Sequence, residues 1–199
     1  MDNKFVSRGG LKLQQAIETF QIEAKDKIVL DVGSSTGGFV DCLLQNGAAK
    51  VFALDTAYGE LAWTLRNDPR VVVMERTNIL HLEELPIPTS SQPSPSGEGE
   101  KVDLITIDAG WTRLELVLKV VKKFLKREGS IVALLKPHYE AEKADLVKGV
   151  LREEKLPEVK ELVEGKIRAL GFGIEHDIES PILGGAGNKE FLLLLKIVQ

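Results

Sequence analysis

The chain has 199 residues, a net charge of −4 and 43% hydrophobic residues, which is enough apolar material for one well-packed domain. Its longest apolar runs, such as residues 191–195, are far too short to span a membrane, and the amino terminus lacks a basic-then-apolar signal pattern. We therefore expect one domain over residues 1–199, located in the cytoplasm and without a membrane partner. A single cysteine excludes an internal disulfide, and three histidines offer no metal-ligand cluster.

The distribution of charge matters more than its total. A net negative charge argues mildly against nucleic acid as a partner, because phosphate binding normally needs a basic surface. Two local clusters are nevertheless basic. One lies near the start of the chain, at Lys4, Arg8 and Lys12, and the other has helical spacing, at Lys119, Lys122, Lys123 and Lys126. A lysine stripe of this second kind is usually only a solvated helix face.

Hydrophobic periodicity predicts alternating helices and strands in the first half of the chain. An apolar stripe formed by Leu13, Ala16, Ile17 and Phe20 indicates a short first helix. The segments after it predict a parallel strand–helix–strand unit with a right-handed crossover. In chain order, we expect a strand over 27–32, a helix over 38–46, a strand over 50–55, a helix over 58–66 and a strand over 71–75.

Residues 86–100 are rich in Pro, Ser, Gly, Thr and Glu, which predicts a disordered insertion within the domain. Regular elements resume after it: a strand over 102–108, a helix over 113–127 capped by Gly129, a strand over 131–135, helices over 140–151 and 157–170, and strands over 172–177 and 191–198. The short connection between the last two strands permits only an antiparallel pair. The fold expected is α/β, with a mostly parallel seven-stranded sheet, an antiparallel last strand and helices on both faces.

The most informative local pattern joins the first strand to the next helix, where Asp31 and Gly33 are followed by Ser-Ser-Thr, Gly37 and Gly38. Backbone N–H groups and a helix dipole at such a turn can hold a ligand. The spacing is not the dinucleotide pattern G-x-G-x-x-G. An aspartate two residues before the first glycine suits a ligand with a cationic amino-acid end, such as S-adenosylmethionine. Glycines also serve ordinary tight turns, so a purely structural role stays open.

Other polar side chains follow strands at the same edge of the expected sheet. Asp55 closes the second strand and can reach a ribose hydroxyl, while Asn78 could contact a base or cap the following turn. Asp108 and Lys136 end two adjacent strands and should lie together at this ligand edge. A mostly parallel sheet with a reversed last strand is the usual Rossmann-like architecture of class I S-adenosylmethionine-dependent methyltransferases, which agrees with the glycine turn.

Several motifs in a fixed order resemble the hemolysin-A-like branch of the FtsJ-like ribose 2′-O-methyltransferases, which act on ribosomal RNA. The resemblance implies S-adenosylmethionine as cofactor and RNA as substrate, either ribosomal RNA or a ribosomal subunit. The matching motifs are Val-Ser-Arg-Gly-Gly-Leu-Lys at 6–12, the glycine turn, Tyr-Gly-Glu-Leu-Ala-Trp at 58–63, Leu-Arg-Asn-Asp-Pro-Arg-Val at 65–71, Met-Glu-Arg-Thr-Asn at 74–78, Leu-Lys-Pro at 135–137, Ser-Pro-Ile at 180–182 and Gly-Asn-Lys-Glu-Phe at 187–191.

The resemblance also implies a catalytic set formed by Lys12, Asp108, Lys136 and Glu190. A ribose 2′-hydroxyl is a poor nucleophile at neutral pH, so a base must take its proton, and we expect Lys136 to do so. Partial burial and the nearby Lys12 ammonium would favour a neutral Lys136 amine, which Asp108 would orient, while Lys12 and Glu190 would position the ribose. No metal is needed. The implied cofactor contacts are Asp31, Gly33, Ser34, Ser35, Thr36, Gly37, Gly38, Phe39, Asp55, Asn78 and Asp108.

The sequence departs from the family pattern in two places. Family members carry an S4-type RNA-binding domain ahead of the Val-Ser-Arg-Gly-Gly motif, whereas only residues 1–5 precede it here, so a separate protein could supply RNA-binding surface. The stretch after Asp108 contains Trp111, which could stack on a base or pack in the core. The alternatives are methylation of a small molecule or a protein, and a cofactor-binding module without RNA catalysis.

Overall fold

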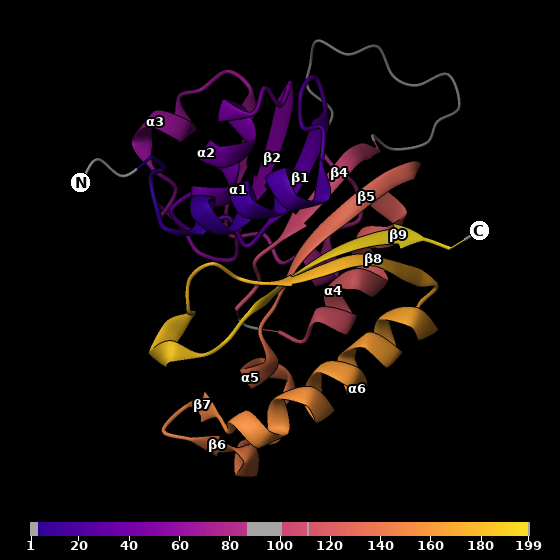
Figure 1. Ribbon diagram of the computed structural model, residues 1–199. Coiled ribbons are helices and arrows are strands. Elements are labelled where there is room, and N and C mark those ends of the chain that lie inside the picture. Colours follow the sequence, from indigo (N-terminus) through magenta and orange to yellow (C-terminus); the bar gives the residue numbers. More distant parts are fainter. Residues whose placement is uncertain (1–3, 87–100, 111, 199) are drawn as a thin grey trace.

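The computed structural model describes residues 4–86, 101–110 and 112–198, and its centre is a sheet of seven strands in the order β3-β2-β1-β4-β5-β9-β8 (Figure 1). Strands β1 to β5 pair in parallel, and β9 is antiparallel to both β5 and β8. The predicted sheet is therefore confirmed. The strands are β1 (Ile28–Val32), β2 (Lys50–Leu54), β3 (Val71–Met74), β4 (Val102–Ile107), β5 (Leu125–Leu135), β8 (Phe172–Glu179) and β9 (Phe191–Ile197).

Helices cover both faces of this sheet (Figure 1). Successive strand residues point to opposite faces, so β1 contributes to two cores. Val29 packs in the cluster that holds the apolar residues of α1 (Gly9–Phe20) and α2 (Gly38–Gln45). Leu30 and Val32 pack in the cluster that holds those of α4 (Leu114–Val121) and α6 (Leu156–Ala169). Within the described part of the chain, no helix is long and apolar enough to cross a membrane.

The helix predicted over 113–127 is too long. Helix α4 ends at Val121, a short 3₁₀ helix η2 (Lys122–Phe124) follows, and β5 already begins at Leu125. Gly129 lies inside β5 and therefore caps no helix. It packs closely against β4, because a Cβ on Gly129 would lie 2.9 Å from the main-chain oxygen of Asp103. Hydrophobic periodicity did not predict the early start of β5. The register of β4 and β5 shifts between Val102 and Leu104, and this irregular pairing extends β5 beyond its apolar run.

The lysine stripe consequently does not lie on one helix. Lys122 Nζ donates to the main-chain oxygen of Leu170 at 2.9 Å, and Lys123 Nζ donates to that of Leu82 at 2.7 Å. Lys126 belongs to β5 and pairs with Asp103 at 2.7 Å. These three ammonium groups therefore make bonds within the protein, so the expectation of a lysine stripe on one solvated helix face is wrong.

The helix predicted over 140–151 is wrong. The chain instead forms a single-turn helix α5 (Pro137–Glu140), a 3₁₀ helix η3 (Lys143–Asp145) and a hairpin of β6 (Leu146–Val147) and β7 (Val150–Leu151). Lys148 and Gly149 form the hairpin turn with φ of 50° and 82°, the left-handed values that a two-residue turn favours. The Val-Lys-Gly-Val pattern was the signal for this turn.

The helix predicted over 58–66 shortens to α3 (Trp63–Arg66). Gly59 has a φ of 77°, and the extended Ala62 precedes the first helical residue, so the chain cannot enter the helix earlier. The remaining short 3₁₀ helices are η1 (Ile79–His81), η4 (Glu153–Lys155) and η5 (Gly185–Gly187). Trp111 and the predicted insertion, apart from its first residue, lie outside the described residues, so both interpretations stay predictions.

Candidate active site

The glycine turn after β1 packs tightly against two neighbouring strands. Gly33 N–H and Ser34 N–H both donate to the main-chain oxygen of Leu54 at the end of β2, at 2.8 and 3.1 Å. Gly33 has a φ of 89°, and a Cβ there would lie 2.7 Å from the main-chain oxygen of Asp108. Only glycine satisfies both the backbone angle and the contact. The turn and Asp108 are therefore fixed to each other.

Two glycines predicted to contact a cofactor have evident packing roles. Gly37 has a φ of 99°, and a Cβ there would collide with the side chain of Leu65. A Cβ on Gly38 would lie 2.8 Å from the main-chain nitrogen of Gly10, at the start of α1. Gly38 thus allows α1 to approach α2 closely, which brings the residues of α1 to the glycine turn.

Asp31 is completely buried on β1, beneath this turn. Its Oδ1 accepts a hydrogen bond of 2.5 Å from Thr106 Oγ1, while its Oδ2 has no partner among the described residues. Burial is the main reason why the pKa of this carboxyl is raised to about 7. A buried carboxylate oxygen without a partner is costly, and a cationic group of a ligand could satisfy it.

Asp55 and Asn78 shape the loops at the same edge of the sheet. Asp55 Oδ2 accepts from Ser35 N–H at 2.7 Å, and its Oδ1 accepts from Ala57 N–H at 2.8 Å, so this carboxylate holds the glycine turn. Asn78 Oδ1 accepts from Leu80 N–H at 3.0 Å and caps η1, which is the alternative left open from the sequence.

A pocket of about 250 Å³ opens between the glycine turn, the start of α1 and the loop before β9. Asp31, Asp55, Gly37 and Asn78 are not among its described lining residues. The other residues predicted to bind cofactor line it, namely Gly33, Ser34, Ser35, Thr36, Gly38, Phe39 and Asp108, and Lys12 lines it as well.

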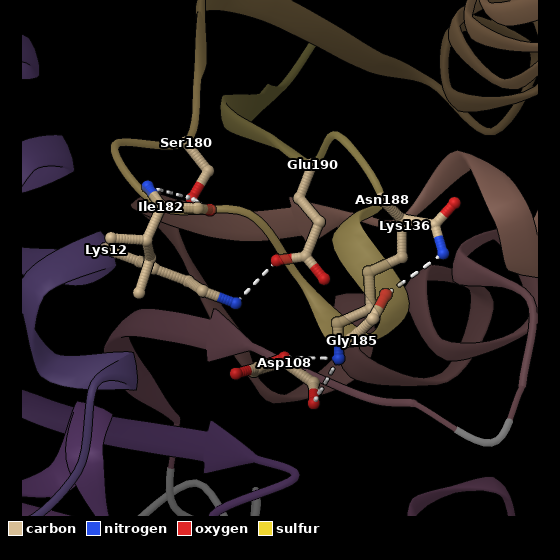
Figure 2. A network of polar contacts seen from close by, with 8 residues as sticks. All are labelled: Lys12, Asp108, Lys136, Ser180, Ile182, Gly185, Asn188 and Glu190. Atoms are coloured by element: carbon tan, nitrogen blue, oxygen red, sulfur yellow. Dashed lines mark hydrogen bonds and ion pairs between the residues drawn. The ribbon is translucent and has the colours of Figure 1, made fainter. Parts of the chain in front are cut away.

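The structure brings together all four residues of the predicted catalytic set as two ion pairs (Figure 2). Lys136 and Asp108 follow the parallel neighbours β5 and β4, and Lys136 Nζ lies 2.6 Å from Asp108 Oδ1. Lys12 comes from α1 and Glu190 from the residue before β9, and Lys12 Nζ donates to Glu190 Oε2 at 2.5 Å. Both members of this second pair are buried, with 9% and 3% of their surface exposed.

One electrostatic expectation changes with this arrangement. Lys12 was expected to act on Lys136 as a nearby ammonium. The structure instead pairs Lys12 with the Glu190 carboxylate, which offsets its charge. Lys136 also faces a carboxylate, that of Asp108. The catalytic roles assigned to these four residues stay predictions.

Asn188 is a supporting residue to which the sequence interpretation gave no role. It is 3% exposed, its Nδ2 donates to the main-chain oxygens of Gly149 and Gly185 at 2.9 and 3.1 Å, and its Oδ1 accepts from Leu151 N–H at 3.0 Å. Asn188 therefore ties the β6–β7 hairpin to the loop that leads to Glu190; its bond to Gly185 is drawn in Figure 2. The Gly-Asn-Lys-Glu motif was the available signal.

Ser180 closes the base of the same loop. Its N–H donates to the main-chain oxygen of Glu190 at 2.8 Å, and its hydroxyl donates to that of Ile182 at 2.8 Å. A Cβ on Gly184 would collide with the Glu190 side chain, so the loop passes directly over this carboxylate. The Ser-Pro-Ile motif thus serves to place Glu190 at the pocket.

Comparison with known proteins agrees with this geometry. Residues 5–197 match the family of FtsJ-like methyltransferases. The chain is 42% identical over 194 residues to YqxC of Bacillus subtilis, covering 96% of this chain and 66% of YqxC. It is 39% identical over 197 residues to the 16S/23S rRNA (cytidine-2'-O)-methyltransferase TlyA of Mycobacterium tuberculosis strain H37Rv, covering 98% of this chain and 69% of TlyA. The chain thus spans about two thirds of the length of these relatives.

Solved structures give the same result. A "Putative hemolysin" from Streptococcus thermophilus superimposes with a TM-score of 0.88 at 37% identity, covering 100% of this chain and 69% of that one. A "putative S-adenosylmethionine dependent methyltransferase" from Listeria monocytogenes has a TM-score of 0.61 at 16% identity, covering 97% of this chain and 100% of that one, and shows the shared fold alone. The sequence match over residues 5–197 shows that this chain belongs to the FtsJ-like methyltransferase family.

Proposed function

We propose that this chain is an S-adenosylmethionine-dependent RNA 2′-O-ribose methyltransferase that acts on ribosomal RNA in the cytoplasm. The observation that carries the proposal is the presence of two ion pairs, Lys136 with Asp108 and Lys12 with Glu190, at the pocket that the glycine turn lines. The TlyA relative, whose name states this activity on 16S and 23S rRNA, gives the proposed substrate class.

The residues around the turn fit S-adenosylmethionine. The unpartnered Oδ2 of Asp31 suits the ammonium of its amino-acid end. The bare backbone at Gly33 lets the turn pack against the main chain of Asp108, which fixes these two lining residues of the pocket relative to each other. When bound, this cofactor supplies an electrophilic methyl group on a sulfonium centre. Ser34, Ser35 and the other lining residues of the turn would form the wall against which it rests.

The protein's own residues would then prepare the ribose hydroxyl for attack. Lys136 Nζ would first release the proton of the ammonium that pairs with Asp108, and would then accept the 2′-hydroxyl proton while Asp108 holds its direction. The Lys12 ammonium can donate to a ribose oxygen, and the Glu190 carboxylate can accept from a ribose hydroxyl. Because direct displacement needs the attacking oxygen in line with the methyl group, this fixed arrangement accounts for much of the expected acceleration.

The test is transfer of labelled methyl groups from S-adenosylmethionine to naked ribosomal RNA and to intact ribosomal subunits, followed by digestion to nucleosides. We expect a labelled 2′-O-methylnucleoside that Lys136→Ala abolishes. Lys119→Ala is the matched control, since this lysine lies on α4 with 53% of its side chain exposed, and it should keep full activity. Label on a base or a protein, or undiminished transfer by Lys136→Ala, contradicts the proposal. Activity on subunits only after adding a cell extract would indicate a separate RNA-binding partner.

A further inference from the structure

Glu140 is a buried carboxylate beside the proposed active site that has no assigned role. It is the last residue of α5 and only 6% exposed. Its Oε1 accepts a hydrogen bond of 2.7 Å from the N–H of Leu114, the first residue of α4. Its Oε2 has no partner among the described residues, and burial raises the pKa of the carboxyl.

This bond replaces a cap that helix α4 lacks locally. The first N–H groups of a helix have no partner within the helix, and a side chain at the preceding residue usually accepts from them. Arg113 holds that position and makes no capping bond within the described structure. Glu140 supplies the acceptor from a different element, and its carboxylate also suits the positive end of the helix dipole.

The same bond joins the two segments that carry the proposed proton-transfer pair. Lys136 immediately precedes α5, which ends at Glu140, and Asp108 directly follows β4 and precedes α4 in the chain. Thr112 from one segment and Tyr139 from the other border a cavity of only about 10 Å³. Because the segments are packed this closely, a shift of one against the other displaces Asp108 relative to Lys136.

We propose that Glu140 is a positioning residue: its bond to Leu114 N–H holds the chain after Asp108 against the chain after Lys136 and so keeps these two side chains in register for methyl transfer. The inference rests on the proposed function, which it deepens. Misplacement of a reacting group by about 1 Å can lower a rate roughly 100-fold. An effect of that size on kcat is what loss of the Glu140 bond should produce.

The experiment compares Glu140→Ala and Glu140→Gln in the full chain. Glutamine keeps an Oε1 acceptor, so its kcat should stay close to that of the unmodified protein. Alanine removes the acceptor and should lower kcat by about 100-fold, with KM for S-adenosylmethionine unchanged because the glycine turn is intact. The control is Asp103→Ala, which removes a carboxylate that accepts from Ile28 N–H at 2.9 Å at the opposite edge of the sheet, and should lower thermal stability without lowering kcat.

Equal kcat for Glu140→Ala and the unmodified protein overturns the inference, as does an equal loss in Glu140→Gln or a KM that rises while kcat stays constant. If Glu140→Ala does not fold, Glu140→Asp serves in its place, because it keeps the charge but is one methylene too short to make the bond.

A readout besides activity separates failure of this inference from failure of the proposed function. In protein labelled at lysine side chains, the NMR signal absent from Lys136→Arg identifies Lys136. Glu140→Ala should move that signal, while Glu140→Gln and Asp103→Ala should not. If the unmodified protein methylates no ribosomal RNA, the proposed function fails, whereas an unmoved Lys136 signal in Glu140→Ala refutes the positioning role itself.

Discussion

Replacing Glu190 by alanine would leave the Lys12 ammonium without its carboxylate partner. The two side chains are 11% and 3% exposed and their charged atoms lie 2.5 Å apart, so water screens the pair only weakly. Removal of one partner of a buried ion pair typically costs about 3–5 kcal/mol, because the remaining charge stays desolvated. That is a large share of the roughly 5–15 kcal/mol that stabilises an ordinary domain.

Equilibrium unfolding in urea measures this effect. With a slope of about 2–3 kcal/mol per molar urea, the expected loss moves the midpoint by about 1–2.5 M. The double variant Lys12→Met/Glu190→Gln removes both charges and should be more stable than the sum of the two single changes predicts, with a coupling of about 1–3 kcal/mol. The control is the exposed pair Lys155–Glu158, 2.8 Å apart, for which Glu158→Gln should leave the midpoint unchanged.

Additive single changes in the double variant, or a Glu190→Ala midpoint as insensitive as that of Glu158→Gln, would refute the reasoning. Either result would mean that water reaches Lys12 Nζ in solution or that the pocket relaxes around it. Because both residues belong to the proposed active site, stability and not activity is the informative quantity here.

Three further predictions concern the turn and the loop around the site. Burial raises the pKa of the Asp31 carboxyl from 3.8 to about 7, so the folded protein binds the carboxyl proton more tightly than the unfolded chain does. The protein should therefore lose stability as the pH rises from about 4 to 7. Urea unfolding should show that Asp31→Asn lacks this loss. Gly33→Ala, at a φ of 89°, should cost about 1–3 kcal/mol and weaken S-adenosylmethionine binding measured by calorimetry. Asn188→Ala should cost about 1–3 kcal/mol and speed hydrogen exchange at the Leu151 amide, whereas unchanged exchange there would contradict its tethering role.

Local sequence determined where the strands lie and which polar residues end them. Strands β1, β2, β4 and β9 are mostly buried runs of apolar and β-branched residues, and parallel neighbours bring their carboxyl ends to one edge of the sheet. For this reason, the contact between Asp108 and Lys136 could be expected from their positions after two successive strands. The antiparallel pairing of the last two strands followed from a short connection.

The same local reasoning failed where long-range contacts overrule propensity. Residues 140–151 have a helix-favouring composition, yet residues 146–151 form a hairpin that turns at the left-handed pair Lys148 and Gly149. Asn188 on the far loop holds that hairpin by bonds to Gly149 and Leu151, which no periodicity in residues 140–151 can reveal. The helix before β5 ended early for a related reason, since Leu125 pairs with Val102 in the sheet.

By itself, the sequence determined the order of the motifs along the chain and the position of the glycine turn. It also determined which residues could meet at the carboxyl edge of the sheet. Only the tertiary structure decided which partners the charged groups have. Lys12 pairs with Glu190, 178 positions away in the sequence, and Glu140 accepts a hydrogen bond from the first residue of α4. One oxygen of Asp31 has no partner among the described residues. The physical reason is that charge pairing and desolvation depend on which groups the packed core brings within a few ångströms, whereas sequence periodicity reports only on neighbours along one element.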